Sequence, residues 1–306
     1  MGRLTQAKQL GKMQDVAGFV DGYSIEVMPR TAAKIADFRE LLPSGTRIYI
    51  ANIDGTPFCD MLETARRIVR EGFSAVPHIT ARTVQNEAEL RKIVQRYREA
   101  GVKEALLLAG GISKPRGEYQ CTMQLLESRI FDGAGFTRVF VAGHPEGNRD
   151  IDVDGGHAEL DKALLRKQEF ALNSGMELEL TTQFAFDADA VVAWVQRIRN
   201  MGVELPVNIG VAGPAKLQTL LKFAISCGVG PSIRVIQRRG RDFTKLLAPF
   251  TPDDMVSALA EFRHNAPDSM IAGLHIFPLG GIRVAVDWAA EQTVGSVGNG
   301  IMEHDQ

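Results

Sequence analysis

Several short apolar segments of this sequence end on a side chain, or on a glycine pair, that could take part in chemistry. In chain order these positions are Glu26, Asn52, His78, Gly110 with Gly111, His144 with Glu146, Gln183, Asn208 and His275. Carboxyl and imidazole groups can transfer protons, and an amide can both donate and accept hydrogen bonds. Convergence of all these segments on one cleft would make that cleft a functional site. The alternative is that strands simply end where water begins and carry polar residues there.

No familiar catalytic motif is complete. The sequence contains no Walker loop, no HExxH and no GxSxG, and the C-terminal GSVGNG follows no strand and opens no helix. His144 and His157 could be metal ligands, but neither has a carboxylate or a cysteine at a fixed spacing. Solvated or hydrogen-bonded histidines are the simpler interpretation, so we expect no metal site.

The elements that must position these residues repeat one pattern, in which a helical stretch is followed by a glycine and a short apolar run. The pattern recurs around Gly72, Gly101, Gly175, Gly202 and Gly228. A glycine just past a helix adopts the left-handed conformation that ends the helix without a Cβ clash. Apolar runs without polar alternation are typical of strands that are buried on both faces, and hence of a parallel sheet.

Eight such runs alternate with helices, which predicts an α/β fold, the closed (β/α)8 TIM barrel. The expected strands are Tyr23–Val27, Arg47–Asn52, Ser74–His78, Ala105–Ala109, Arg138–Ala142, Glu177–Thr182, Pro206–Ile209 and Leu274–Phe277. Ser232–Gln237 is an alternative eighth strand, which would leave Leu274–Phe277 outside the barrel. We find no linker and expect residues 1–306 to form a single domain with short N- and C-terminal extensions. Active sites of such barrels lie at the carboxyl ends of the strands.

Composition excludes several classes of protein. The 306 residues are 45% apolar and 24% charged, with a net charge of −2, which argues against a nucleic-acid binder. The three cysteines are widely spaced, as suits a reducing compartment. The N-terminus lacks the apolar core of a signal peptide, and the sequence has no apolar run of membrane-spanning length. We therefore expect a cytoplasmic protein that binds neither nucleic acid nor membrane.

Four motifs in register resemble one family. YSIEVMPR resembles the SFEFFPP(K/R) opening of methylenetetrahydrofolate reductases, and VPHIT resembles their PHLT. VAGHPEGN resembles their AxYPExH, and LLRKQEFALNSGMELELTTQFAFD resembles their LKRKxxAGAxxxITQFFFD. The likeness runs from Tyr23 to about Asp187 and is weaker beyond, where LHIFPL stands for the family's last strand. The family fold is the same barrel that the strand pattern predicts.

The resemblance implies a flavoprotein oxidoreductase of one-carbon metabolism and methionine biosynthesis. Such an enzyme binds FAD at the strand ends and takes a hydride from NAD(P)H. It passes the hydride to the methylene carbon of 5,10-methylenetetrahydrofolate, which gives 5-methyltetrahydrofolate, and the reaction can run in reverse. A tetrahydrofolate-type substrate and a homo-oligomeric assembly are expected on the same ground.

The resemblance also implies roles for individual residues. Glu26 occupies the position of the family's general acid, which protonates folate N10, and the alternative is a carboxylate paired with Arg30 or a helix N-terminus. Gln183 matches a pterin-binding glutamine, and Arg283 could replace a family arginine that meets the folate tail. The expected cofactor contacts are Asn52, His78, Gly110, Gly111, His144 and Lys167. Structural roles, such as capping a strand end or a solvated helix lysine, remain the alternatives.

Departures from the family motifs keep other functions open. The fourth strand of the family ends in LRGD, with the Arg and Asp on the cofactor, but this chain reads LLAGG, so Ala109 and Gly111 replace both. The seventh-strand PGI becomes VNIGVAG. A reductase that uses NADH without flavin is one alternative. A barrel methyltransferase that binds methyltetrahydrofolate is the second, and a catalytically inactive barrel retained as a binding module is the third.

Overall fold

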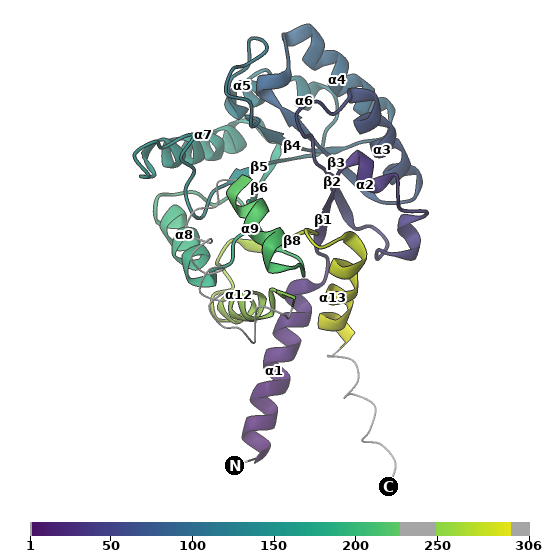
Figure 1. Cartoon of the computed structure of the whole chain (residues 1–306). Coiled ribbons are helices and arrows are strands. Elements are labelled where there is room, and N and C mark those ends of the chain that lie inside the picture. Colours follow the sequence, from purple (N-terminus) through teal and green to yellow (C-terminus); the bar gives the residue numbers. More distant parts are fainter. Residues whose placement is uncertain (1, 227–248, 295–306) are drawn as a thin grey trace.

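Eight parallel strands close into a barrel in the computed structural model of the chain (Figure 1). The structure describes residues 2–226 and 249–294, and it describes the side chains of residues 11–225 and 249–293. Each strand pairs with its neighbours in chain order, and β8 closes the ring by pairing with both β7 and β1. The strands are β1 Ser24–Val27, β2 Arg47–Ile50, β3 Ser74–Thr80, β4 Glu104–Leu108, β5 Arg138–Gly143, β6 Glu177–Thr182, β7 Val207–Ala212 and β8 Ile271–Phe277.

The predicted (β/α)8 barrel is therefore confirmed, and Leu274–Phe277 belongs to the closing strand. Ser232–Gln237 lies outside the described residues. The expected end of β7 was wrong, because this strand continues to Ala212 and places Asn208 near its start. The glycine at position 210 suggests a strand break in the sequence, but it lies within β7, where packing leaves no room for a side chain. A Cβ there would lie 2.5 Å from the Thr182 carbonyl oxygen.

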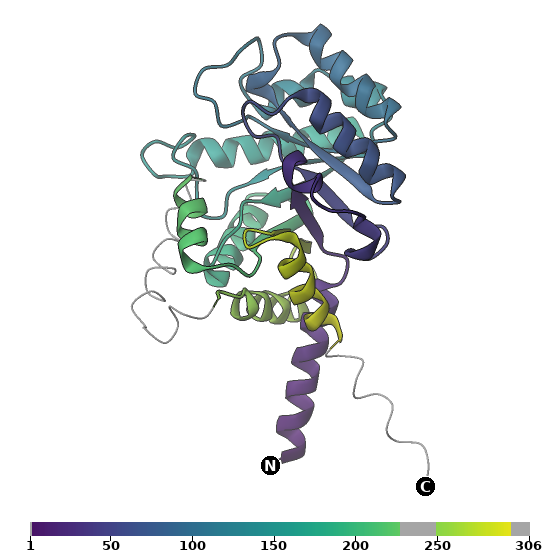
Figure 2. The same cartoon turned by 45° about the vertical axis from the view of Figure 1, so that its right-hand side comes forward.

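Helices surround the barrel (Figures 1 and 2). They are α1 Gly2–Val20, α2 Pro29–Ala32, α3 Phe58–Arg70, α4 Glu87–Glu99, α5 Thr122–Glu127, α6 Ile130–Gly133, α7 Ala158–Ser174, α8 Ala188–Asn200, α9 Leu217–Ser226, α12 Asp253–Asn265 and α13 Ile282–Val294. Short 3-10 turns lie at Phe38–Glu40 and Ala81–Thr83. Gly72, Gly101, Gly175 and Gly202 follow helices with positive φ, as predicted, and Gly228 lies outside the described residues.

Most apolar residues form two cores, and a third, smaller cluster lies at the carboxyl ends of β6–β8. One of the two cores lies between the strands and the helices and includes the buried apolar faces of α3 and α4. The other lies inside the barrel and consists of Tyr49, Val76, Leu106 and Phe140. Side chains of a strand alternate between these two cores, so residues two apart on one strand point the same way. This alternation turns Ser24 and Glu26 of β1 into the barrel.

The helix α1 packs against α12 and α13, and its N-terminus projects away from the barrel in both cartoon views. Asp15 of α1 contacts His264 of α12 at 2.9 Å, and Arg263 lies over the ring of Phe19. No helix within residues 2–226 and 249–294 is long and apolar enough to cross a membrane.

Candidate active site

Glu26 and His78 meet inside the carboxyl end of the barrel. Oε2 of Glu26 lies 3.4 Å from Nε2 of His78, and the Glu26 side chain keeps 21% of its surface exposed. Burial raises the pKa of Glu26 to about 8 and lowers the pKa of His78 to about 3. Both groups are therefore uncharged near neutral pH, and the proton resides on the carboxyl. Arg30 is exposed, so His78 is the ionisable neighbour of Glu26 in the part of the chain described here.

Asn52 and Gly110 both lie close to Thr80, the last residue of β3. The Asn52 amide donates to Oγ1 of Thr80 at 3.3 Å, and Thr80 in turn bonds Thr83 at 2.6 Å. A Cβ on Gly110 would come within 3.1 Å of Thr80, whereas a Cβ on Gly111 would meet nothing within 4 Å. His78 lies within β3 rather than at its end, because the strand extends two residues further than expected.

Lys167 reaches the carboxyl end of β5 from α7. Its Nζ donates to the Ala142 carbonyl at 3.0 Å, and only 7% of the residue is exposed. Burial lowers the pKa of Lys167 to about 8. Burial and the charge of Lys167 lower the pKa of the nearby His144 to about 4. A solvated lysine is therefore excluded, and this side of the barrel mouth holds a buried ammonium group beside a neutral imidazole.

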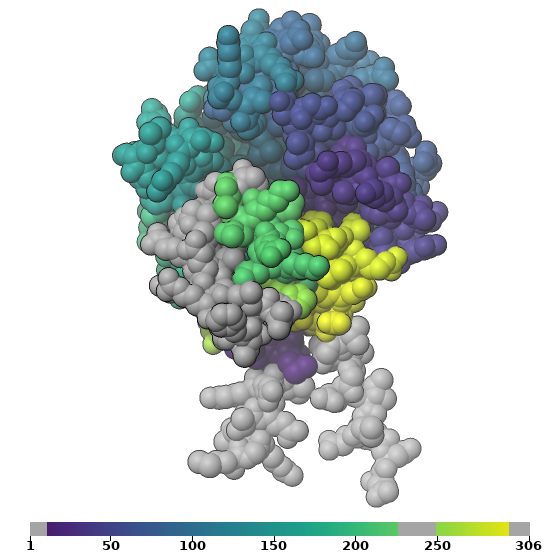
Figure 3. Space-filling view, viewed as in Figure 1, coloured from purple at the N-terminus to yellow at the C-terminus, as the bar shows by residue number. Residues whose placement is uncertain are grey.

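Gln183 follows β6 directly. Its backbone N–H donates to the Gly143 carbonyl at 3.3 Å, and its Oε1 accepts from the Phe184 N–H at 3.0 Å. Phe184 is the middle of a ladder of edge-to-face rings that passes through Phe186 and Phe277. These rings pack with α9 into a separate apolar cluster, and Figure 3 shows α9 beside α13 on the surface. The cluster fills the β6–β8 side of the mouth and holds Gln183 against it.

Two other predicted positions do not join these groups. Arg283 is exposed in the first turn of α13, beyond the carboxyl end of β8. His275 was expected at a strand end but lies in the middle of β8, where 1% of it is exposed. Its Nδ1 bonds Ser24 at 2.9 Å, its ring lies 4.4 Å from that of Tyr49, and burial lowers its pKa to about 3. His275 thus belongs to the floor below Glu26.

Asn208 is also removed from the site. Its amide donates to Glu179 at 2.8 Å, at the amino end of the barrel. Glu146 remains in the loop that follows His144 and is partly buried. His157 is exposed at the start of α7, and no group of three potential metal ligands occurs among the described residues.

Arg82 is the residue that inspection of the sequence misses. It lies in the 3-10 turn after β3 and donates to the carbonyls of Gly110, Ile112 and Gln120 at 3.1–3.4 Å. The signal was the basic residue two positions after the VPHIT motif. Because β3 was expected to end at His78, Arg82 was expected to lie in the loop that follows and received no role.

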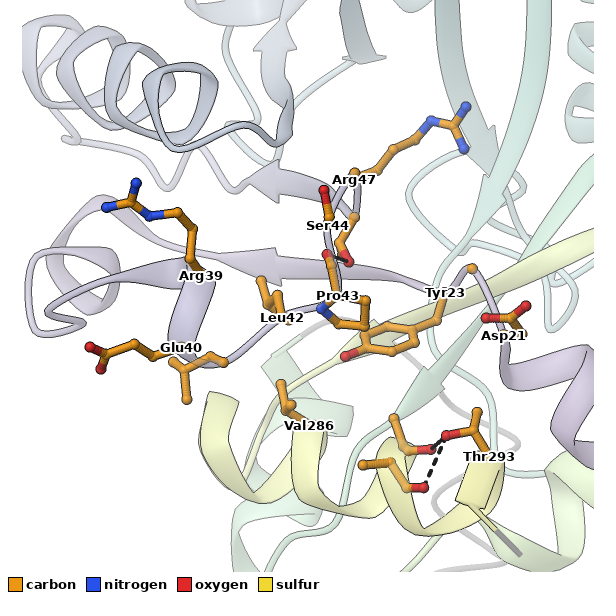
Figure 4. Close-up of a pocket in the computed structure, with 16 residues that line it drawn as sticks. Asp21, Tyr23, Arg39, Glu40, Leu42, Pro43, Ser44, Arg47, Val286 and Thr293 are labelled. Atoms are coloured by element: carbon orange, nitrogen blue, oxygen red, sulfur yellow. Dashed lines mark hydrogen bonds between the residues drawn. The ribbon is translucent and has the colours of Figure 1, made fainter. Parts of the chain in front are cut away.

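A cavity of about 460 Å³ lies at the opposite end of the molecule. Its lining comes from the loop before β2, from Tyr23 ahead of β1, and from the C-terminal half of α13. The Tyr23 ring extends into it between Pro43 and α13 (Figure 4). The cavity shares no residue with the polar groups at the carboxyl ends, so it is not part of the candidate site.

Comparisons with known proteins complete the description. A sequence profile of the family described as "Methylenetetrahydrofolate reductase" matches residues 61–235, more than half of the chain. A curated relative, the "5,10-methylenetetrahydrofolate reductase" of Pectobacterium carotovorum subsp. carotovorum, is 26% identical over 160 residues. This match covers 52% of the chain and 50% of the relative, so the chain spans about half the length of that protein.

A solved structure, "Phosphonopyruvate Hydrolase Complex with Oxalate and Mg++", matches with a TM-score of 0.45 and 14% identity. The match covers 92% of this chain and 84% of that one.

Proposed function

Because the chain belongs to the methylenetetrahydrofolate reductase family, we propose that it reduces 5,10-methylenetetrahydrofolate to 5-methyltetrahydrofolate. NAD(P)H is the hydride donor in this proposal, and FAD binds at the carboxyl end of the barrel. The folate methylene carbon accepts a hydride, and the nitrogen that leaves it, N10, accepts a proton. The site must therefore supply one acid in a cleft that admits both ligands.

The observation that carries the proposal is the burial of the Glu26 carboxyl beside His78. Ionised carboxylates cannot donate, and an unperturbed glutamate is almost fully ionised at pH 7. Burial raises the pKa of Glu26 to about 8, close to the pH at which a general acid works best. The remaining 21% exposure of its side chain leaves the carboxyl accessible from the barrel mouth.

His78 keeps Glu26 in this state. An imidazolium 3.4 Å away would stabilise the carboxylate and lower the pKa of Glu26. Burial instead lowers the pKa of His78 to about 3, so the ring stays neutral and its Nε2 can accept a hydrogen bond from the carboxyl. No described residue forms a hydrogen bond with this nitrogen. It is buried, and the carboxyl of Glu26 lies 3.4 Å from it.

The donor set on the other side of the mouth fits a flavin dinucleotide. Lys167 is buried and bonded to a carbonyl oxygen, with no described carboxylate within ion-pair distance, so its positive charge is available for a phosphate group. Asn52, His144 and the glycine turn offer polar atoms and close backbone approach. When bound, FAD would carry the hydride from NAD(P)H to the folate.

In this proposal Gln183 binds the pterin. Its Oε1 is held by the Phe184 N–H, which fixes the orientation of the amide against the aromatic cluster. An amide fixed in this way can present its N–H groups to the acceptor atoms of a pterin edge. Arg283 stands further out on α13 and is exposed, which suits contact with the carboxylates of a folate tail.

A visible absorption spectrum of the purified protein tests the proposal first. A flavin spectrum that NAD(P)H bleaches and methylenetetrahydrofolate restores is the expected result. A colourless protein that binds folate and transfers its methyl group would instead support the barrel methyltransferase. A colourless protein that oxidises NADH with methylenetetrahydrofolate would support the flavin-independent reductase. A protein that binds folate and catalyses neither reaction would be a binding module.

A further inference from the structure

The loop after β4, residues 109–121, is fastened to the segment after β3. The backbone N–H of Arg82 donates to the Ala109 carbonyl at 2.9 Å, and the backbone N–H of Arg116 donates to the Arg82 carbonyl at 2.8 Å. The Glu118 N–H donates to the Gln85 carbonyl at 2.9 Å. These bonds hold the beginning of the loop, the turn Gly110–Ile112, in one place.

The side chain of Arg82 binds only carbonyl oxygens in this part of the chain. Its Nη1 donates to Ile112 at 3.1 Å and to Gly110 at 3.4 Å, and its Nε donates to Gln120 at 3.1 Å. No described carboxylate lies within salt-bridge distance of this guanidinium. Carbonyl groups bind N–H donors of Nε and Nη1 but leave the positive charge without a counter-charge.

Backbone N–H groups of the same turn are available for hydrogen bonds to a ligand. None of the described residues accepts a hydrogen bond from the backbone N–H of Gly110, Gly111 or Ile112. Gly110 has a φ of +96°, which bends the chain in a way that favours glycine. Consecutive free N–H groups in such a turn form a concave site for negative charge. Arg82 binds the Gly110 carbonyl, which lies on the opposite side of its peptide from the Gly111 N–H. Its positive charge therefore strengthens the dipole that this N–H presents to an anion.

The turn lies at the mouth that holds Glu26. It follows β4 directly, and a Cβ on Gly110 would touch Thr80, which shares the inner face of β3 with His78. Gly111 is exposed and faces open space. A bound ring that contacts Glu26 and His78 would therefore have one edge close to this turn.

We propose that Arg82 and the Gly110–Ile112 turn form an anion-binding element that stabilises the reduced flavin ring. This inference rests on the proposed function. A hydride brings one proton and two electrons, so a neutral oxidised ring becomes an anion as NAD(P)H becomes NAD(P)⁺. Arg82 and the free N–H groups bind that anion more tightly than the neutral ring. The site has the opposite polarity to the LRGD sequence, which carries a carboxylate at the position of Gly111.

The test compares Arg82→Gln with Arg116→Gln in the flavin-loaded protein. Arg116 lies on the same loop but pairs with Asp54 at 2.6 Å, where both side chains are about half exposed. Arg82→Gln should weaken binding of reduced flavin about tenfold relative to oxidised flavin, which for a two-electron couple lowers the midpoint potential by about 30 mV. Arg116→Gln should change that ratio less than about twofold, because an exposed charge is screened by solvent. Equilibration with a reference dye gives the potential, and fluorescence quenching gives the affinity of the apoprotein for oxidised flavin.

Three further variants separate charge from folding. Arg82→Lys keeps the charge but loses most of the carbonyl bonds, so the potential should stay near the wild-type value while the loop becomes more sensitive to protease. Gly111→Asp adds a carboxylate where a Cβ meets no atom, and it should lower the potential as Arg82→Gln does. Gly111→Asn is its matched neutral control and should leave the potential nearly unchanged.

Equal shifts in Arg82→Gln and Arg116→Gln, or no shift in Arg82→Gln, would overturn the inference. If Arg82→Gln does not fold, an unchanged or raised potential in Gly111→Asp overturns it instead. Failure of the wild-type protein to bind flavin would refute the flavin-dependent part of the proposed function, and this inference with it. Flavin binding without a selective effect of Arg82 would refute the inference alone.

Discussion

The two ends of the barrel differ in how their ionisable residues are paired. At the amino end, Glu104 contacts Arg47 at 3.0 Å and Arg138 at 3.4 Å. Arg138 also contacts Glu177 at 2.6 Å and Glu179 at 3.0 Å. At the carboxyl end, Glu26, His78, His144 and Lys167 have no carboxylate–cation pair among the described residues.

The difference shows how each end avoids the cost of a buried charge. Opposite charges neutralise one another at the amino end, and this arrangement fixes the strands without any chemistry to perform. At the carboxyl end, burial changes the protonation state instead, and it raises the pKa of Glu26 and lowers those of His78 and Lys167. The pKa values of Glu26 and Lys167 thereby move toward neutrality, and such shifts are typical of functional sites. We therefore propose that the barrel has a structural end and a reactive end.

The largest expected effect is on proton donation by Glu26. Glu26→Gln keeps the shape of the side chain but removes the proton, so reduction of folate should slow about 10²–10⁴-fold. Reduction of flavin by NAD(P)H needs no such acid and should keep its rate. Stopped-flow measurement of the two half-reactions checks this, with the exposed Glu169→Gln on α7 as the matched control. An unchanged folate half-reaction would remove Glu26 from the mechanism.

Gln183 should show a smaller effect, confined to the folate. Truncation in Gln183→Ala leaves polar atoms of the pterin unpaired in a site that excludes water, at a cost of roughly 1–3 kcal/mol. Single-turnover kinetics should place that loss in the folate half-reaction and spare the NAD(P)H half-reaction. A similar loss in both would mean that Gln183 supports the aromatic cluster rather than the substrate.

The amino end provides the contrasting experiment. Glu104→Gln removes the shared partner of Arg47 and Arg138, and a loss of about 1–2 kcal/mol in the free energy of unfolding is expected for partly exposed pairs. Denaturant titration measures this loss. The rate per folded molecule should not change, because these residues lie at the opposite end from Glu26. If both half-reactions slowed in Glu104→Gln, the division between the two ends would be wrong.

The sequence predicts the barrel well because its strands are apolar runs between helices that end in glycine. It predicts the site less completely. The pairing of Ser24 with His275 joins residues 251 positions apart, and only closure of the barrel brings them together. The burial of Lys167 depends on how α7 docks, which helical periodicity alone does not give.

Incorrect expected ends of individual strands gave some residues the wrong place in the barrel. The early end assigned to β7 placed Asn208 at the mouth, although it bonds Glu179 at the amino end. The early end assigned to β3 hid Thr80 and Arg82, whose contacts organise the turn after β4. The roles proposed for Glu26, Gln183, Arg283 and the cofactor contacts stay predictions until the variants are measured.

The most direct test of the account is the protonation state of Glu26 itself. Infrared spectra of wild-type protein and Glu26→Gln, recorded across pH 5–10, isolate the carbonyl stretch of this one carboxylic acid. We expect a protonated carboxyl at pH 7 that titrates near the pKa of about 8 and is absent from the variant. A difference spectrum showing only carboxylate at pH 7, with titration near the ordinary value for glutamate, would contradict the assignment of Glu26 as the acid.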